Sequence, residues 1–164
     1  MILVIFWENI LNNILFKLYQ KIAFLGDAEK VHDVSLPVLE FIYKSYFGTI
    51  FHKKIIKKET KQFDIPFDNP IGLAAGFDKN ADYLNFLSNI GFGFIEVGTL
   101  TPKPQLGNPK PRVFRIINDE AIINHLGFNN KGIDYGISQI KKFNRNIPIG
   151  INIGKNASTD IKDA

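Results

Sequence analysis

Three short apolar runs constrain the fold of this chain more than any other feature. They are NPIGLAAG at residues 69–76, FGFIEVGT at 92–99 and IPIGINIG at 147–154. Residues 83–90 and 133–140, which lie between these runs, have apolar side chains at helical spacing. Alternating strands and helices, with strands that are apolar on both faces, predict a parallel sheet with crossover helices.

Capping and stop residues define the ends of the first predicted helix. Asp78 precedes the first helix as a candidate N-cap, and Gly91 follows it as a stop. The apolar face of that helix is expected to comprise Tyr83, Leu84, Leu87 and Ile90. The second helix is marked by Ile133, Ile137 and Ile140, and VFRIINDEAII at 113–123 predicts a small hairpin.

The type of parallel sheet follows from missing motifs. The sequence contains neither G-x-G-x-x-G after the first strand nor G-x-x-x-x-G-K-[ST]. A doubly wound nucleotide-binding fold is therefore disfavoured, and a β/α barrel is favoured. In such barrels, polar residues at the C-terminal ends of strands carry the function.

Each predicted strand ends in a residue suited to a ligand. Gly76 would let a flat ligand approach the backbone, and Lys79 would hold an anion or balance the charge of a reduced cofactor. Asn152 offers a donor and an acceptor to a heterocycle. Taken singly, a solvated lysine, a β-prone Thr99 and a satisfied asparagine are the more ordinary interpretations. Three such residues in register on successive strands favour a site.

A long loop joins the second and third strands. It includes TLTPKPQLGNPKPRVFR and NHLGFNN, and long loops in compact domains are usually functional or disordered. The second stretch suits a polar planar ligand covered by an aromatic ring, or is an Asn-rich turn. Arg112 and Arg115 are expected to form either an anion site or a salt-bridged rim.

Residues 1–58 differ in character. Apolar residues at helical spacing run from the start to Gly26, and a second amphipathic segment, SLPVLEFIYKSYFGTIF, spans 35–51. The basic stretch HKKIIKKETK follows at 52–61. The charged residues argue against a membrane-spanning helix, and a signal peptide is also disfavoured. A segment lying on a membrane surface and a helical lid on the rest of the protein remain two alternatives.

Composition excludes several classes of site. The chain is 45% hydrophobic, has a net charge of +4, and contains no cysteine and three histidines far apart in sequence. A disulfide scaffold and a thiolate metal site are therefore excluded, and no metal-ligand spacing occurs. The mild basic charge suits an anionic surface, but no motif for binding nucleic acid is present.

Residues 69–132, NPIGLAAGFDKN through NHLGFNNKG, together with IGINIGKN at 149–156, resemble the first half of dihydroorotate dehydrogenase. The motifs follow the family's order over about residues 68–156. The apolar helices in front resemble the extension of the membrane-associated, quinone-dependent class. The resemblance implies a small two-helix domain at 1–58 and the first part of an FMN-binding (β/α)8 barrel at 59–164.

The family's activity sets the expected partners. Dihydroorotate would be oxidised to orotate in pyrimidine synthesis, with FMN as cofactor and a quinone arriving between the N-terminal helices. The implied location is peripheral to a membrane, on the cytoplasmic face of the inner membrane in a bacterium. Nucleic acid is not an expected partner.

The resemblance assigns residues motif by motif. Cofactor contacts are expected from Ala75, Gly76, Phe77, Asp78, Lys79, Thr99 and Asn152. Substrate contacts are expected from Lys79, Asn124, His125, Leu126, Gly127 and Phe128, although the family usually has arginine where this chain has His125. His32 and Arg115 match positions lining the quinone tunnel. Asp78 is expected to cap the helix or to hold Lys79.

The family's catalytic serine lies in a motif resembling N-x-S-S-P-N, which does not occur in residues 1–164. The base is therefore expected beyond residue 164, and the 164-residue chain alone is expected to be inactive. Three hypotheses follow. The chain is the front half of the enzyme, a non-catalytic membrane-surface or interaction protein, or one piece of a split enzyme whose other half is a second polypeptide.

Overall fold

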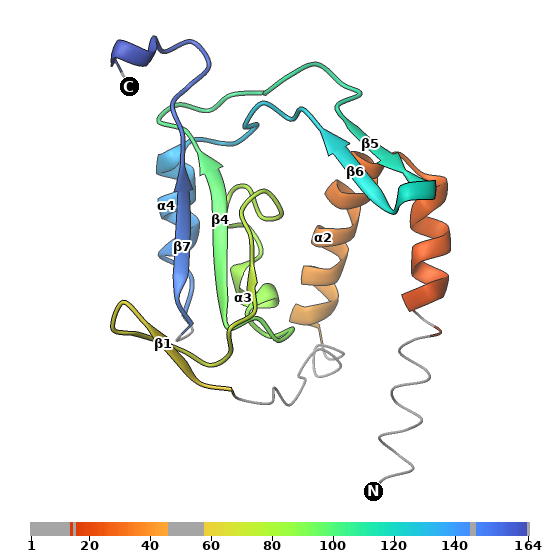
Figure 1. Ribbon diagram of the computed structural model, residues 1–164, viewed down its shortest axis with the longest axis horizontal. Coiled ribbons are helices and arrows are strands. Elements are labelled where there is room, and N and C mark those ends of the chain that lie inside the picture. Colours follow the sequence, from red (N-terminus) through yellow and green to blue (C-terminus); the bar gives the residue numbers. More distant parts are fainter. Residues whose placement is uncertain (1–13, 15, 46–57, 145–146, 164) are drawn as a thin grey trace, which may run out of the picture.

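The computed structural model describes residues 14, 16–45, 58–144 and 147–163. At its centre is a parallel sheet in the order β3-β4-β7, formed by β3 (Gly72–Leu73), β4 (Phe94–Leu100) and β7 (Ile149–Ile153). Because the strands run in one direction, their C-terminal ends meet at one edge (Figure 1). The expected mixed α/β fold with parallel strands is confirmed, and closure into a barrel stays a prediction.

The hydrophobic core lies between β4 and the helices on one face of the sheet. Ile95 and Val97 of β4 and Leu87 of α3 (Leu84–Leu87) have no exposed surface, and Leu36 of α2 (Ala28–Lys44) joins the same cluster. Helix α4 (Ile133–Ile140), which forms at the predicted place, contributes Ile140 to the edge of this core. Burial of these apolar side chains fixes the sheet on which the strand ends sit.

Two elements are shorter than the sequence predicts. Strand β3 has two residues, and α3 has four rather than the eight expected for 83–90. Ala81, with φ of +62°, interrupts the chain ahead of α3. At its end, the Asn89 amide donates to the Asn85 carbonyl at 2.6 Å. Such local side-chain bonds compete with continued helix.

The N-terminal part contains a helical segment at 16–25, ending before Gly26 as predicted, and helix α2 (Ala28–Lys44). Helix α2 starts earlier than the expected segment at 35, because Asp27 caps it by accepting from the Lys30 amide at 2.9 Å. None of the helices in the described ranges has the length and hydropathy to span a membrane. Residues 1–13 and 46–57, which contain the start of the first expected helix and most of the basic stretch, lie outside the described residues.

Two antiparallel hairpins flank the sheet. The predicted one is formed by β5 (Val113–Ile116) and β6 (Ala121–Asn124), which are joined by η2 (Ile117–Asp119), and it lies beside the N-terminal helices (Figure 1). The other, formed by β1 (Thr60–Gln62) and β2 (Ile65–Phe67), was not predicted and lies at the opposite end of the strands. A short 3-10 turn, η3 (Ile161–Asp163), follows β7.

Candidate functional site

The segment after β3 is tied to the end of β4 by backbone hydrogen bonds. The amide of Gly76 donates to the Gly98 carbonyl at 2.8 Å, and the Gly98 amide donates to the Asp78 carbonyl at 3.1 Å. Both glycines have left-handed φ, but a Cβ on Gly98 would lie 2.5 Å from the Asn152 carbonyl oxygen. A Cβ on Gly76 would meet nothing within 4 Å. Gly98 is therefore required by packing, whereas Gly76 borders open space that a flat ligand can enter.

Polar side chains from β4 and β7 form one hydrogen-bonded group beside this space. The Thr99 hydroxyl donates to Asn152 Oδ1 at 2.6 Å, and Asn152 Nδ2 donates to Glu96 Oε1 at 3.2 Å. The asparagine inside an apolar strand is thus satisfied, as a half-buried amide must be. It holds a fixed orientation, with its second amide hydrogen available to a ligand.

Asp78 organises the loop between β3 and α3. Its carboxylate is 1% exposed and accepts from the backbone amides of Asp82 and Tyr83, both at 2.9 Å. Burial raises the pKa of this carboxyl, and the two amides oppose that shift. Of the two expected roles, capping is observed, at the turn before α3 rather than at its N-cap. No ion pair between Asp78 and Lys79 occurs in the described part of the chain.

Lys79 is half-buried next to this loop. Burial lowers the pKa of its ammonium group, while the carboxylates of Asp33 and Glu29 act in the opposite direction. A partly desolvated cation interacts more strongly with an anion than a fully hydrated one does. The position therefore suits binding of an anionic substrate.

The loop of residues 124–128 follows β6. Asn124 Oδ1 accepts weakly from the Leu126 amide at 3.4 Å, and Gly127 and Phe128 both have left-handed φ. A Cβ on Gly154 would lie 2.7 Å from Thr99 Cγ2 and 3.8 Å from Phe128 Cδ2. The aromatic ring of the loop therefore reaches the ends of β4 and β7.

His125 has a different environment from the rest of the loop. Its ring stacks on Phe114 of β5, with centroids 5.9 Å apart and planes 12° apart. Its backbone amide donates to the Arg112 carbonyl at 3.0 Å. The side chain of His125 thus packs on the hairpin.

A pocket of about 850 Å³ lies between the N-terminal helices, the β5–β6 hairpin and the segment after β3. Its size falls in the range usual for ligand pockets. Among its lining residues are His32, Gly76, Phe77, Lys79, Arg115, Asn124 and Leu126. The two predicted quinone residues therefore share one pocket with predicted cofactor and substrate residues. Thr99 and Asn152 lie at the adjoining strand ends, and Ala75 is half-buried just after β3.

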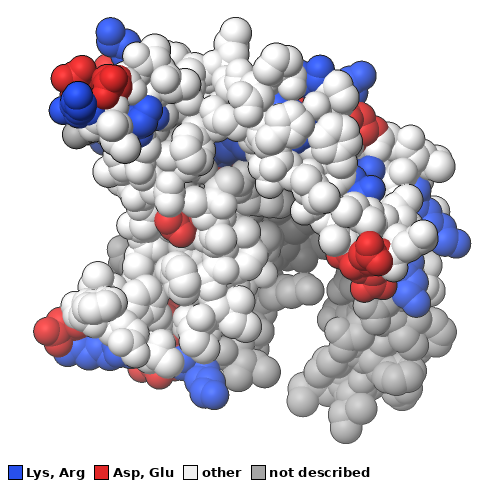
Figure 2. Space-filling view, turned by 45° about the horizontal axis from the view of Figure 1, so that its top comes forward, with Lys and Arg blue, Asp and Glu red and all other residues white. Residues whose placement is uncertain are grey.

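His32 and Arg115, which both line this pocket, are each held by a hydrogen bond to another segment of the chain. His32 Nε2 lies 2.8 Å from the Phe77 carbonyl oxygen, and its ring meets Phe77 edge-on at 5.2 Å. Arg115 donates to the carbonyls of Gly26 and Ala23 at 2.7 and 3.2 Å. These bonds attach both the strand-end segment and the hairpin to the helices. On the face seen in Figure 2, charged side chains lie mostly at the margins and uncharged residues cover the centre.

Sequence reasoning missed the contribution of Glu29. This carboxylate is 6% exposed and pairs with Arg112 at 2.7 Å, with the result that Arg112 belongs to a salt-bridged rim rather than an anion site. Arg112 lowers the pKa of Glu29, and burial partly opposes this shift. An acidic residue in the first turn of a helix was the available sequence signal, but it gives no indication of a partner so distant in sequence.

Comparison with known proteins decides the family. The family model for dihydroorotate dehydrogenase matches residues 57–164. The chain belongs to the dihydroorotate dehydrogenase family. It is 54% identical over 147 residues to dihydroorotate dehydrogenase (quinone) of Buchnera aphidicola subsp. Schizaphis graminum, covering 90% of this chain and 44% of that protein. It is 48% identical over 150 residues to the protein of the same name from Neisseria meningitidis serogroup A, covering 92% of this chain and 44% of that protein.

Solved structures of dihydroorotate dehydrogenases agree with this assignment. The crystal structure of DHODH from Eimeria tenella in complex with ferulenol superimposes with a TM-score of 0.71 at 39% identity, covering 82% of this chain and 38% of that one. The ligand-free form from the same organism gives 0.70 at 40% identity. The chain spans less than half the length of the curated relatives it matches.

Proposed function

We propose that this chain forms the N-terminal part of a quinone-dependent dihydroorotate dehydrogenase, which oxidises dihydroorotate to orotate in pyrimidine biosynthesis. One observation carries the proposal: a single pocket is lined by His32 of α2, Arg115 of β5, Lys79 in the segment after β3 and Asn124 at the end of β6. A quinone entering between the helices and a substrate at the strand ends would thereby approach a common cofactor position.

The strand ends fit FMN. Gly76 leaves open space beside the backbone, Thr99 and Asn152 offer polar groups in a fixed orientation, and Lys79 supplies a cation. When bound, FMN would supply the redox chemistry, accepting a hydride equivalent from the substrate and passing electrons to the quinone. Ala75, Phe77 and Asp78 complete the proposed cofactor segment.

The chain's own groups would bind and orient the substrate. Lys79 would neutralise the substrate carboxylate, Asn124 would hydrogen-bond the substrate, and residues 126–128 would cover it and exclude water. The proton acceptor is proposed to lie outside residues 1–164. His32 and Arg115 would line the approach of the quinone, with Arg115 offering hydrogen bonds to a carbonyl oxygen.

FMN retention tests the proposal. Ile153 of β7 is 73% exposed and Ile151 is 43% exposed, which suits a sheet that continues with further strands. The 164-residue chain alone is therefore expected to purify without flavin and without turnover. Co-expressed with the part of the Buchnera relative that follows the matched region, it is expected to purify yellow, as measured by flavin absorbance. Stoichiometric FMN on the 164-residue chain alone would contradict this expectation, and colourless protein in both cases would count against the flavin site.

Membrane association is a second part of the proposal. Leu25 is 89% exposed and Phe41 of α2 is 74% exposed, and neither lines the pocket. Exposed apolar helical faces bind the interfacial layer of a bilayer. Deleting residues 1–50, or combining Leu25→Glu with Phe41→Glu, is expected to move the protein from the membrane pellet to the supernatant. Leu106→Glu, at a loop residue 90% exposed, is the matched control and should leave the partition unchanged. Equal partition of all variants would refute surface binding.

A further inference from the structure

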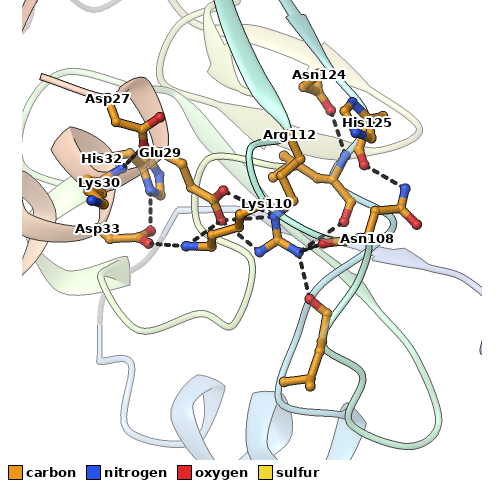
Figure 3. A network of polar contacts seen from close by, with 12 residues as sticks. Asp27, Glu29, Lys30, His32, Asp33, Asn108, Lys110, Arg112, Asn124 and His125 are labelled. Carbon is orange, nitrogen blue, oxygen red and sulfur yellow. Dashed lines mark hydrogen bonds and ion pairs between the residues drawn. The ribbon is translucent and has the colours of Figure 1, made fainter.

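Arg112 is the centre of a buried polar network that joins the N-terminal helices to the loops at the strand ends (Figure 3). The residue is 5% exposed. Its Nε lies 3.1 Å from both carboxylate oxygens of Glu29, and its Nη2 lies 2.7 Å from Glu29 Oε1. The guanidinium thus presents two of its three nitrogens to one carboxylate of α2, the geometry of a forked ion pair.

The third guanidinium nitrogen, Nη1, bonds to loop carbonyls. Arg112 Nη1 donates to the carbonyl of Leu106 at 2.7 Å and to that of Asn108 at 2.8 Å, with the Leu126 carbonyl at 3.5 Å. Carbonyls from two separate segments therefore converge on one cation. The distance between these two segments therefore depends on the position of the Arg112 guanidinium.

Further hydrogen bonds link the same segments to the loop of residues 124–128. The Arg112 carbonyl accepts from the His125 amide, and the Asn108 amide donates to the Leu126 carbonyl, both at 3.0 Å. Asn108 Nδ2 donates to the His125 carbonyl at 2.6 Å. Arg112 and Asn108 thereby both bond to His125 and Leu126 of the loop. A displacement of Arg112 would be transmitted directly to these two residues, which follow Asn124 in the chain.

Glu29 determines where Arg112 sits. It is 6% exposed in the first turn of α2, and besides Arg112 it contacts Lys110 at 3.2 Å. Removing the carboxylate partner of a buried guanidinium leaves an uncompensated buried charge, which strongly disfavours the buried position of the guanidinium. The same carboxylate lines the pocket together with Asn124 and Leu126. The Glu29–Arg112 ion pair therefore connects α2 to the loop of residues 124–128.

We propose that Glu29 and Arg112 are positioning residues, which hold the loop of residues 124–128 in the geometry that binds substrate, so that the N-terminal helices set substrate affinity as well as access for quinone. This inference rests on the proposed function. It assigns no contact with substrate to either residue. Its effect is expected in loop order and in the KM for dihydroorotate, while kcat and flavin content change little.

Glu29→Gln tests the proposal, with Glu40→Gln as the matched control. Glu40 lies on the same helix, is 8% exposed, and pairs at 2.8 Å with Lys44, whose side chain is 66% exposed. In the complete protein, Glu29→Gln is expected to speed amide hydrogen exchange at His125 by about tenfold or more, since bonds to charged groups are the stronger ones. The dihydroorotate KM should rise by about tenfold, with kcat within about threefold of the parent. Glu40→Gln should change neither quantity.

Glu29→Asp keeps the charge, and its His125 amide exchange and dihydroorotate KM are both expected to stay close to the parent values. This variant also provides a readout if Glu29→Gln folds poorly. Equal exchange at His125 in Glu29→Gln and Glu40→Gln would overturn the proposal, as would faster exchange with an unchanged dihydroorotate KM. A failure of the proposed function is seen separately, because the parent protein would then not oxidise dihydroorotate at all.

Discussion

Replacing Lys79 by methionine is expected to slow flavin reduction by dihydroorotate by about 10²- to 10³-fold, the usual effect of removing one preorganised charged or hydrogen-bonding group from an active site. Methionine keeps much of the length and apolar volume of lysine but removes the charge. Lys79 is half-buried and lines the pocket with Asn124, and the other cation that lines this pocket, Arg115, is already bonded to the carbonyls of Gly26 and Ala23. The measurement is anaerobic single-turnover reduction, with flavin content determined in the same samples.

Lys141→Met is the matched control for this experiment. Lys141 is exposed at the C-cap of α4, and its replacement should leave the reduction rate within about twofold of the parent, as for most surface substitutions. Burial lowers the pKa of Lys79. As the pH rises, the parent enzyme should therefore lose its Lys79-dependent activity with a midpoint below 10.5, the usual pKa of lysine. If the Lys79→Met variant retained its flavin and was reduced at the full rate, the assignment of Lys79 to the substrate site would be wrong.

Leu87→Ala is expected to lower the free energy of unfolding by about 2–5 kcal/mol, the range for buried leucines that leave a cavity. Leu87 of α3 has no exposed surface and belongs to the core cluster of Ile95 and Val97. That cluster supports β4, whose end carries Thr99. The measurement is urea unfolding followed by circular dichroism.

Leu106→Ala provides the comparison for the core substitution. Leu106 is 90% exposed, so the same change in composition should alter the unfolding free energy by less than about 0.5 kcal/mol. Similar small effects for both substitutions would mean that α3 does not pack on β4 as described.

The sequence predicted those elements whose signal is local. Strands β4 and β7, the β5–β6 hairpin and α4 all form where short apolar runs, turn signals or helical spacing predicted them. Two of the three polar residues predicted at the strand ends, Thr99 and Asn152, are in contact, because parallel strands place their C-terminal ends at one edge. Thr99 and Asn152 are joined by a hydrogen bond although 53 residues separate them.

Features set by competition or by distant partners were not predictable. Helix α3 ends at Leu87 rather than at residue 90, where the side chains of Ser88 and Asn89 both donate to the Asn85 carbonyl. The β1–β2 hairpin turns at Phe63 and Asp64, both with positive φ and neither of them glycine. The Glu29–Arg112 pair joins residues 83 positions apart, and no local pattern encodes such a contact.

The most direct test of the central claim is to add dihydroorotate anaerobically to the flavin-bound protein that contains these residues. We expect that the flavin absorbance is bleached, that orotate appears in equal amount, and that a quinone restores the colour. Flavin that is bound and reducible by dithionite but unaffected by saturating dihydroorotate would contradict the assignment of this site.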